Sequence, residues 1–131
     1  MSGGEAPWHA HIYAKDGERA AAENLRSRFA EALTSGKIAN LRHIGSLAET
    51  RVGSHPLPQF EVHFLGAAEA QVRALIKASG LTALIHPLTN DDIADHTRLA
   101  HWIGEPIALD LSVLDPPGVN QGLARFGRSD L

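Results

Sequence analysis

The sequence contains no cysteine, which excludes a disulfide framework, a zinc site built from thiolates and a cysteine nucleophile. No apolar run approaches the roughly 20 residues of a membrane-spanning helix, so we expect no membrane partner. The net charge of −3 comes from interspersed residues, and no basic stripe indicates a nucleic-acid partner. Residues 1–7 lack the basic and apolar regions of a secretory signal. We therefore expect a soluble, cytoplasmic protein.

Histidine is unusually frequent, with eight residues in a chain of 131. The length suits a single domain, 1–131, and the 44% hydrophobic fraction is ordinary for a globular protein. Residues 1–7 are small and polar, and the chain from about 116 to 131 shows little periodicity. We expect both ends to be irregular.

Hydrophobic periodicity divides the chain into strands and helices. Apolar residues three and four apart predict a helix from an N-cap at Asp16 to about Ser35, ending at Gly36. Further helices are expected at 67–79 and 91–103. The expected strands are 8–14, an irregular 37–51, 59–65, 81–86 and 107–114.

The first six elements follow the order β-α-β-β-α-β, which predicts an α+β, ferredoxin-like fold with an added C-terminal helix and tail. In that topology the helices cover one face of an antiparallel sheet in which strand 8–14 is central. Its neighbours are strands 59–65 and 81–86. The opposite face is expected to be open.

The central strand carries His9, His11 and Tyr13 on one side, because side chains alternate between the faces of a strand. Strand 59–65 places Glu61 and His63 on its polar side, opposite three apolar residues. The face of His86, at the end of strand 81–86, is uncertain because both sides of that strand are apolar. Two histidines and one carboxylate with open positions suit non-haem iron(II). The alternative is a solvated surface, or a surface buried in a dimer.

Two histidines outside the strands are candidates for acid–base chemistry. His55 lies in the loop before strand 59–65, where it can act as a base, a proton donor or a ligand, or simply face water. His96 falls on the apolar side of helix 91–103, so it is either part of the site or a buried structural histidine. His43 and His101 are interpreted as structural or surface residues.

Five blocks of the sequence together resemble the DOPA 4,5-dioxygenase family, over roughly residues 8–114. The blocks are His9-Ala10-His11-Ile12-Tyr13, 53–62 (Gly-Ser-His-Pro-Leu-Pro-Gln-Phe-Glu-Val), 84–89 (Leu-Ile-His-Pro-Leu-Thr), Asp95-His96-Thr97 and Trp102-Ile103-Gly104. The family pattern has Gly-Pro-His-Pro before the third strand. Ser54 stands at the first of those prolines, while His55 is kept.

The resemblance implies a small ferredoxin-like homodimer related to fungal enzymes that cleave the catechol ring of DOPA with O2. A catechol-type aromatic substrate, O2 and a bound metal are therefore expected. Fe(II) is the expected metal, with Zn or another divalent ion as the alternative. A nearby histidine would take the catechol proton and return it later, because its pKa lies near neutrality.

Strand geometry selects His11, Glu61 and His86 as the metal ligands, and His9 is able to replace one of them or to contact substrate. His55 and His96 are the acid–base candidates, and Tyr13 is expected to orient substrate. A different interpretation is a non-catalytic ferredoxin-like dimer in which the same face binds a metal or a small molecule. A third is a dimer whose sheet faces form the interface.

Overall fold

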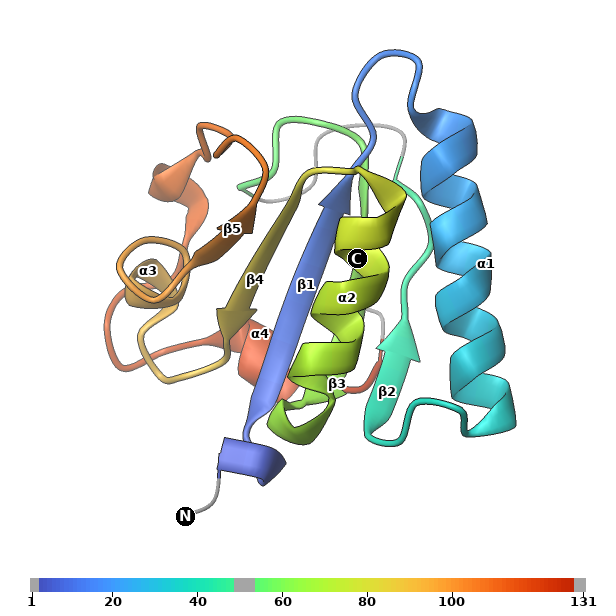
Figure 1. Ribbon diagram of the computed structural model, residues 1–131. Helices are drawn as coiled ribbons and strands as arrows, with labels where there is room; N and C mark the ends of the chain where they lie inside the picture. The colour runs from blue at the N-terminus through green and yellow to red at the C-terminus, as the bar shows by residue number, and fades with distance from the viewer. Residues whose placement is uncertain (1–2, 49–53, 129–131) are drawn as a thin grey trace.

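A five-stranded antiparallel sheet forms the centre of the computed structural model, which describes residues 3–48 and 54–128. Two long helices, α1 and α2, lie on one face of the sheet (Figure 1). The strands are β1 (Pro7–Tyr13), β2 (Leu41–Ile44), β3 (Gln59–Leu65), β4 (Ala83–Pro87) and β5 (His101–Ile103). The helices are α1 (Arg19–Ser35), α2 (Glu69–Ser79), α3 (Asp92–Asp95) and α4 (Gln121–Ala124), with short 3-10 turns at Gly3–Glu5, Gly66–Ala68 and Leu111–Val113.

The strand order β2-β3-β1-β4-β5 confirms the ferredoxin-like arrangement, with β1 between β3 and β4. β5 extends the sheet beyond β4. The register places His9 opposite His63 on β3 and opposite His86 on β4. It also places His11 opposite Glu61. The predicted polar residues of three adjacent strands therefore share one face, and the uncertain His86 joins them.

The core lies between this sheet and the two helices. β1 contributes Ala10 and Ile12, β3 contributes Phe60, and all three side chains are fully buried. Phe29 of α1 and Ile76 of α2 are fully buried against them in the same cluster. Burial of each large apolar side chain stabilises the fold by about 1.5–3 kcal/mol.

α1 begins later than predicted. Asp16 is not its N-cap, because the helix starts at Arg19 and Glu18 occupies the cap position. Glu18 Oε1 accepts a hydrogen bond of 2.9 Å from the backbone N–H of Lys15. Between them Gly17 adopts a left-handed φ of 82° and turns the chain. The predicted end at Gly36 is confirmed, with a left-handed φ of 76°.

The predicted strand 37–51 is shortened to β2, followed by an isolated bridge between Ala48 and Gln59; positions 49–51 lie outside the described residues. Gly45 accounts for part of the irregularity. A Cβ atom at Gly45 would lie 3.0 Å from Cγ of Glu61, so a larger residue here would require the Glu61 side chain to shift.

The predicted helix 91–103 is wrong beyond its first turn. Asp91 caps α3 by accepting a hydrogen bond from the Ala94 N–H, but α3 ends at Asp95. The chain then forms β5, in which Trp102 pairs with Leu84. β5 occupies the free edge of β4, and the predicted strand 107–114 does not form. That stretch instead contains a 3-10 turn with exposed Leu111 and Val113.

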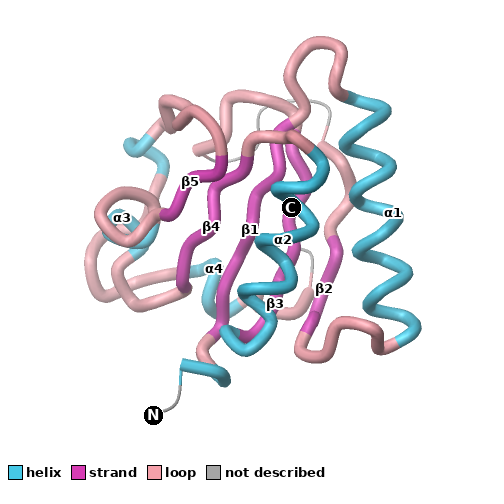
Figure 2. Tube along the Cα trace, in the orientation of Figure 1, coloured by secondary structure: helices cyan, strands magenta, loops and turns pink. Residues whose placement is uncertain are grey.

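The sequence predicted an open face opposite α1 and α2. The structure shows instead that other segments of the chain cover this face. The loop before β3, the α3 region and the C-terminal segment with α4 lie over it (Figure 2). His63 and His86 are therefore only 1% exposed in the single chain. The predicted irregular tail contains α4, whose N-cap Asn120 accepts a hydrogen bond from the Gly122 N–H. Within the described residues, none of the helices has the length and apolar character needed to cross a bilayer.

Candidate metal centre and active site

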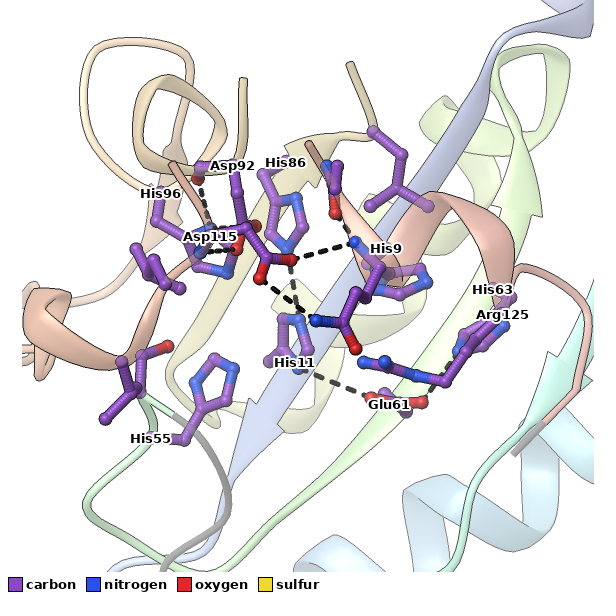
Figure 3. Close-up of a pocket in the computed structure, with 17 residues that line it drawn as sticks. His9, His11, His55, Glu61, His63, His86, Asp92, His96, Asp115 and Arg125 are labelled. Carbon is purple, nitrogen blue, oxygen red and sulfur yellow. Dashed lines mark hydrogen bonds and ion pairs between the residues drawn. The ribbon is translucent and has the colours of Figure 1, made fainter. Parts of the chain in front are cut away.

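Five histidines converge beneath these covering segments, and we call them the histidine cluster: His9, His11, His55, His86 and His96. β1 supplies two of them and β4 supplies one. The other two come from the loop before β3 and from the residue after α3. Every member is at least nine-tenths buried. The rings face one another across a cavity of about 200 Å³ (Figure 3).

His11 and His86 form the closest pair in the cluster, with 3.1 Å between their Nε2 atoms. The Nδ1 atom of His11 lies 3.1 Å from the side-chain oxygen of Gln59, and Nδ1 of His86 lies 2.8 Å from the carbonyl oxygen of Pro87. Both oxygens only accept hydrogen bonds, so each Nδ1 carries the proton and each Nε2 presents a lone pair. Two lone pairs at this distance repel each other unless a cation lies between them.

The separation of these two nitrogens fits a shared metal ion. Ligand nitrogens bind such ions at about 2.0–2.2 Å, so two of them at a right angle lie about 3 Å apart. Neutral imidazoles whose Nδ1–H groups donate to oxygens are the usual arrangement around protein-bound metals. His9 adds a further donor, because its Nε2 is buried and has no hydrogen-bond partner among the described residues. These donors suit a first-row divalent metal.

Burial keeps four members of the cluster, His9, His11, His55 and His86, in the neutral form that binds metals. It lowers the pKa of His9, His11 and His86 well below the usual value, and neighbouring imidazoles lower each pKa further. Burial also lowers the pKa of His55 to about 3. These four rings are therefore uncharged at neutral pH and available as ligands or hydrogen-bond partners.

His55 and His96 reach the cluster with different hydrogen-bond partners. Burial raises the pKa of Tyr13, so the phenol stays protonated and donates to Nδ1 of His55 across 2.7 Å. The proton of His55 then lies on Nε2. His96 does the opposite, because its Nδ1 donates to the Asp92 carbonyl oxygen 2.8 Å away and leaves Nε2 as an acceptor. One ring thus presents a hydrogen-bond donor to the cluster and the other an acceptor.

Glu61 occupies the other side of His11. Its Oε1 accepts a hydrogen bond of 2.7 Å from Nε2 of His63, and its Oε2 lies 4.0 Å from Nδ1 of His11. The backbone N–H of Gly127 donates to Nδ1 of His63, which fixes the proton of that ring on Nε2. Glu61 therefore approaches the back of the His11 ring, away from the nitrogen that faces His86.

The possible ligand atoms fall into overlapping groups, each with all its atoms within 4.8 Å of one another. One group joins His11 and His86 to His9, and a second joins His11 to His55 and His96. Glu61 falls in a third group, with His9 and His63. Of the three residues selected from the sequence as ligands, the structure brings His11 and His86 together and places Glu61 beside them rather than with them. The ligand role of Glu61 stays a prediction.

The other predicted residues lie at or behind the cavity wall. Tyr13 is fully buried and contacts His55 instead of lining the cavity, while its ring stacks on Trp102 at 6.1 Å. His9 and His63 stack on each other at 4.0 Å and both line the cavity. His43 and His101 are absent from the described wall, and His101 is exposed.

Part of the wall has no counterpart in the residues selected from the sequence. These residues include Asp92, Leu114, Asp115, Asn120, Gln121 and Arg125. Most belong to the tail, where no periodic pattern distinguishes wall residues from loop residues. The sequence carries no local signal that places them over the sheet.

This chain resembles proteins of other organisms. An uncharacterised 21.2 kDa protein of Botryotinia fuckeliana is 37% identical over 76 residues, which is 50% of this chain and 42% of that protein. The chain thus matches less than half the length of this curated relative. A crystal structure from Nostoc punctiforme, described as a "putative dioxygenase", has a TM-score of 0.65 and 29% sequence identity. That similarity covers 82% of this chain and 90% of the other.

The family comparison covers most of the chain, including every member of the histidine cluster. Residues 8–113 match the Dopa 4,5-dioxygenase family, the same family that the histidine-containing blocks resemble. The match begins at β1 and ends after the 3-10 turn at Leu111–Val113. This chain belongs to the Dopa 4,5-dioxygenase family.

Proposed function

We propose that this protein is a metal-dependent extradiol dioxygenase that opens the ring of a catechol-type substrate with O2. The observation that carries the proposal is the pair of Nε2 atoms of His11 and His86, 3.1 Å apart with both Nδ1 atoms hydrogen-bonded to oxygens. Membership in the Dopa 4,5-dioxygenase family supports the reaction class. In the proposed reaction both atoms of O2 enter the product, and the ring carbon–carbon bond next to the diol breaks.

The proposed metal ligands are His11 and His86, with His9 as a third imidazole from the same group of ligand atoms. Fe(II) is the proposed metal. When bound, the metal supplies Lewis-acid positions for the two catechol oxygens and for O2. Gln59 and the Pro87 carbonyl oxygen keep the two imidazoles oriented by accepting their Nδ1–H groups. Glu61 contributes negative charge 4.0 Å from the His11 ring.

His96 is the proposed base, and His55 is the proposed proton donor, which can release its Nε2 proton as its Nδ1 takes up the Tyr13 proton. Nε2 of His96 can accept a catechol proton, because its Nδ1 already donates to the backbone of Asp92. The Asp92 carboxylate, 3.4 Å from Nδ1, stabilises the imidazolium that forms. His55, held by the Tyr13 hydroxyl, presents an N–H to the same side of the cluster. The centroids of the donor and acceptor rings lie 6.1 Å apart, so one substrate could contact both.

The cavity favours a small substrate. Its volume of about 200 Å³ is below the range of about 300–1,000 Å³ that is typical of pockets for drug-sized ligands. A single aromatic ring with a short side chain is the class of molecule that matches this space. The buried imidazoles around it hold that ring near the donor nitrogens.

Anaerobic reconstitution with Fe(II), followed by a panel of catechols in oxygenated buffer, tests the proposal. We expect about one Fe(II) per chain, oxygen consumption and yellow semialdehyde products. The His11→Ala variant is expected to lose both metal and activity, whereas His101→Ala, an exposed histidine on β5, keeps them.

Two outcomes would overturn the proposal. Failure to bind Fe(II) would remove the metal centre. Tight metal binding without oxygen consumption on any catechol would favour a non-catalytic metal-binding protein instead.

A further inference from the structure

The wall of the cavity extends beyond the family match. That match ends at residue 113, yet the segment 114–128, which we call the C-terminal segment, supplies a large part of the described wall. Its wall residues are Leu114, Asp115, Asn120, Gln121, Gly122 and Arg125. The histidine cluster lies inside the family match and this segment outside it. Chemistry common to the family and substrate choice specific to this chain can therefore reside in different parts of one cavity.

Directed hydrogen bonds fix the C-terminal segment over the cluster. The side-chain amide of Asn120 donates to the Thr89 carbonyl oxygen at 2.7 Å and to Asp95 Oδ2 at 2.9 Å. The backbone N–H of Gly127 donates to His63 at 2.9 Å. Arg125 lies between these two anchors, so its position relative to the cluster is set by the fold.

The three carboxylates of the cavity wall already have partners. Asp92 Oδ2 accepts the backbone N–H of Asp115, and Asp115 accepts both the backbone N–H and the side-chain amide of Gln121. Glu61 accepts the N–H of His63. An ammonium group on a substrate would therefore have to compete with contacts that hold the wall together.

Arg125 is the exception among the charged groups of the wall. Among the described residues its guanidinium has neither a hydrogen bond nor an ion pair, although the residue is half-buried. Figure 3 shows the side chain of Arg125, the residue that follows α4, reaching toward the middle of the cavity near Glu61. A half-buried cation without a partner is an electrostatic site for an anion.

We propose that Arg125 binds a carboxylate on the substrate, and that the preferred substrate is a catechol with an anionic side chain and no ammonium group. This inference rests on the proposed function. The planar guanidinium can donate two parallel hydrogen bonds to a carboxylate. The diol of the same molecule would then lie against the histidine cluster, with the side chain pointing to the C-terminal segment. Arg125 sets specificity and takes no part in breaking the ring.

Steady-state kinetics on three catechols tests the proposal in the Fe(II)-loaded protein. The substrates are 3,4-dihydroxyphenylacetate, 4-methylcatechol and dopamine, whose side chains are anionic, neutral and cationic. Wild-type kcat/KM is expected to be highest for 3,4-dihydroxyphenylacetate. Arg125→Gln should lower that value about ten- to a hundredfold and change the value for 4-methylcatechol less than about twofold, as loss of one charged hydrogen-bonding group predicts.

Two further variants separate specificity from folding. Arg125→Lys keeps the positive charge but lacks the planar guanidinium that donates two parallel hydrogen bonds. It should therefore retain part of the preference for the carboxylate that Arg125→Gln loses. Arg128→Gln removes an exposed arginine of the same segment, whose guanidinium donates to the Ala124 carbonyl, and should leave all three substrates unchanged. Equal losses on all three substrates in Arg125→Gln, or a wild-type preference for dopamine or 4-methylcatechol, would overturn the proposal.

Binding of phenylacetate, which has the carboxylate but no diol, gives a result that is independent of ring cleavage. NMR titration should show binding to the wild-type protein and its loss in Arg125→Gln. If no catechol is cleaved but this difference remains, the proposed function fails while the anion site stands. If phenylacetate does not bind, or binds equally to both proteins, the anion site itself is refuted.

Discussion

The two faces of the sheet are built from the same strands but hold together in different ways. On β1, Ala10 and Ile12 point into an apolar core beneath α1 and α2, whereas His9 and His11 point into the histidine cluster. The apolar face depends on non-directional burial, which stabilises the fold. The polar face depends on hydrogen bonds that set the orientation of each ring. Alternate residues of one strand thus serve different purposes, because one set stabilises the core and the other forms the histidine cluster.

The two faces of the sheet also differ in their effect on the free energy of unfolding. Burying neutral imidazoles with lone pairs directed at each other opposes folding unless a partner is bound. In the described part of the chain, the buried side chains of the apolar cluster are all hydrocarbon, so they contain no polar atom that could be left unpaired. We therefore expect the polar face to lower the free energy of unfolding of the metal-free protein.

Acid should lower the free energy of unfolding of the metal-free protein, because buried histidines of the polar face become protonated when the chain unfolds. His9, His11 and His86 have a lowered pKa in the folded state, and that of His55 is lowered to about 3, so the unfolded chain binds more protons below about pH 6.5. Stability is therefore present above that pH and lost progressively toward about pH 3. Urea unfolding at a series of pH values measures the trend. A free energy of unfolding that does not change between pH 6.5 and 4 would contradict the burial of neutral rings.

Phe60→Ala should damage the apolar face alone. The ring is fully buried in the core, so its removal should lower the free energy of unfolding by about 3–5 kcal/mol. Fe(II) affinity of the molecules that remain folded should change little, because the cluster lies on the other side of β3. Urea unfolding and metal titration report the two quantities, and Leu111→Ala, at an exposed position, is the control. Loss of metal affinity in step with stability would show that the two faces are not separable.

Gln59→Leu should damage the polar face alone. The substitution removes the oxygen that accepts the His11 Nδ1–H, so the ring loses its orientation. Loss of such an outer partner typically weakens metal affinity about 10- to 100-fold. Isothermal titration with Fe(II) under anaerobic conditions measures the change. Unaltered affinity would mean that Gln59 does not orient the metal ligand.

His101→Ala should have the smallest effect, because this histidine is exposed on β5, the edge strand. Its ring contacts Trp8 edge-on but lies away from the cavity. The free energy of unfolding should change by less than about 0.5 kcal/mol, as expected for a surface substitution. Thermal unfolding and Fe(II) titration check both expectations. A large change in either would show that histidines outside the cluster also matter.

The elements that the sequence predicted best are those with strict periodicity. The alternation of Phe60, Val62 and Phe64 with Glu61 and His63 gave both the strand and its two faces, because strand geometry has only one way to orient such a pattern. The face of His86 could not be derived, because Leu84 and Ile85 on successive positions of β4 are both buried.

Local sequence patterns could not predict the elements that depend on contacts with residues far away in the sequence. The capping signal at Asp91 indicated where α3 begins, but pairing of β5 with β4 determines where the helix ends. Likewise, the contact of Asn120 with Asp95 brings the tail over the sheet, and no periodic signal in the tail reveals it. The histidine cluster was therefore largely predictable, whereas the wall that contains Arg125 was not.

Anomalous scattering at the iron edge, from crystals of Fe(II)-loaded protein kept under anaerobic conditions, would show whether His11 and His86 hold the metal. We expect one peak per chain at about 2.0–2.2 Å from Nε2 of both residues. A peak at Glu61 and His63 without contact to this pair, or no peak on this face of the sheet, would contradict it.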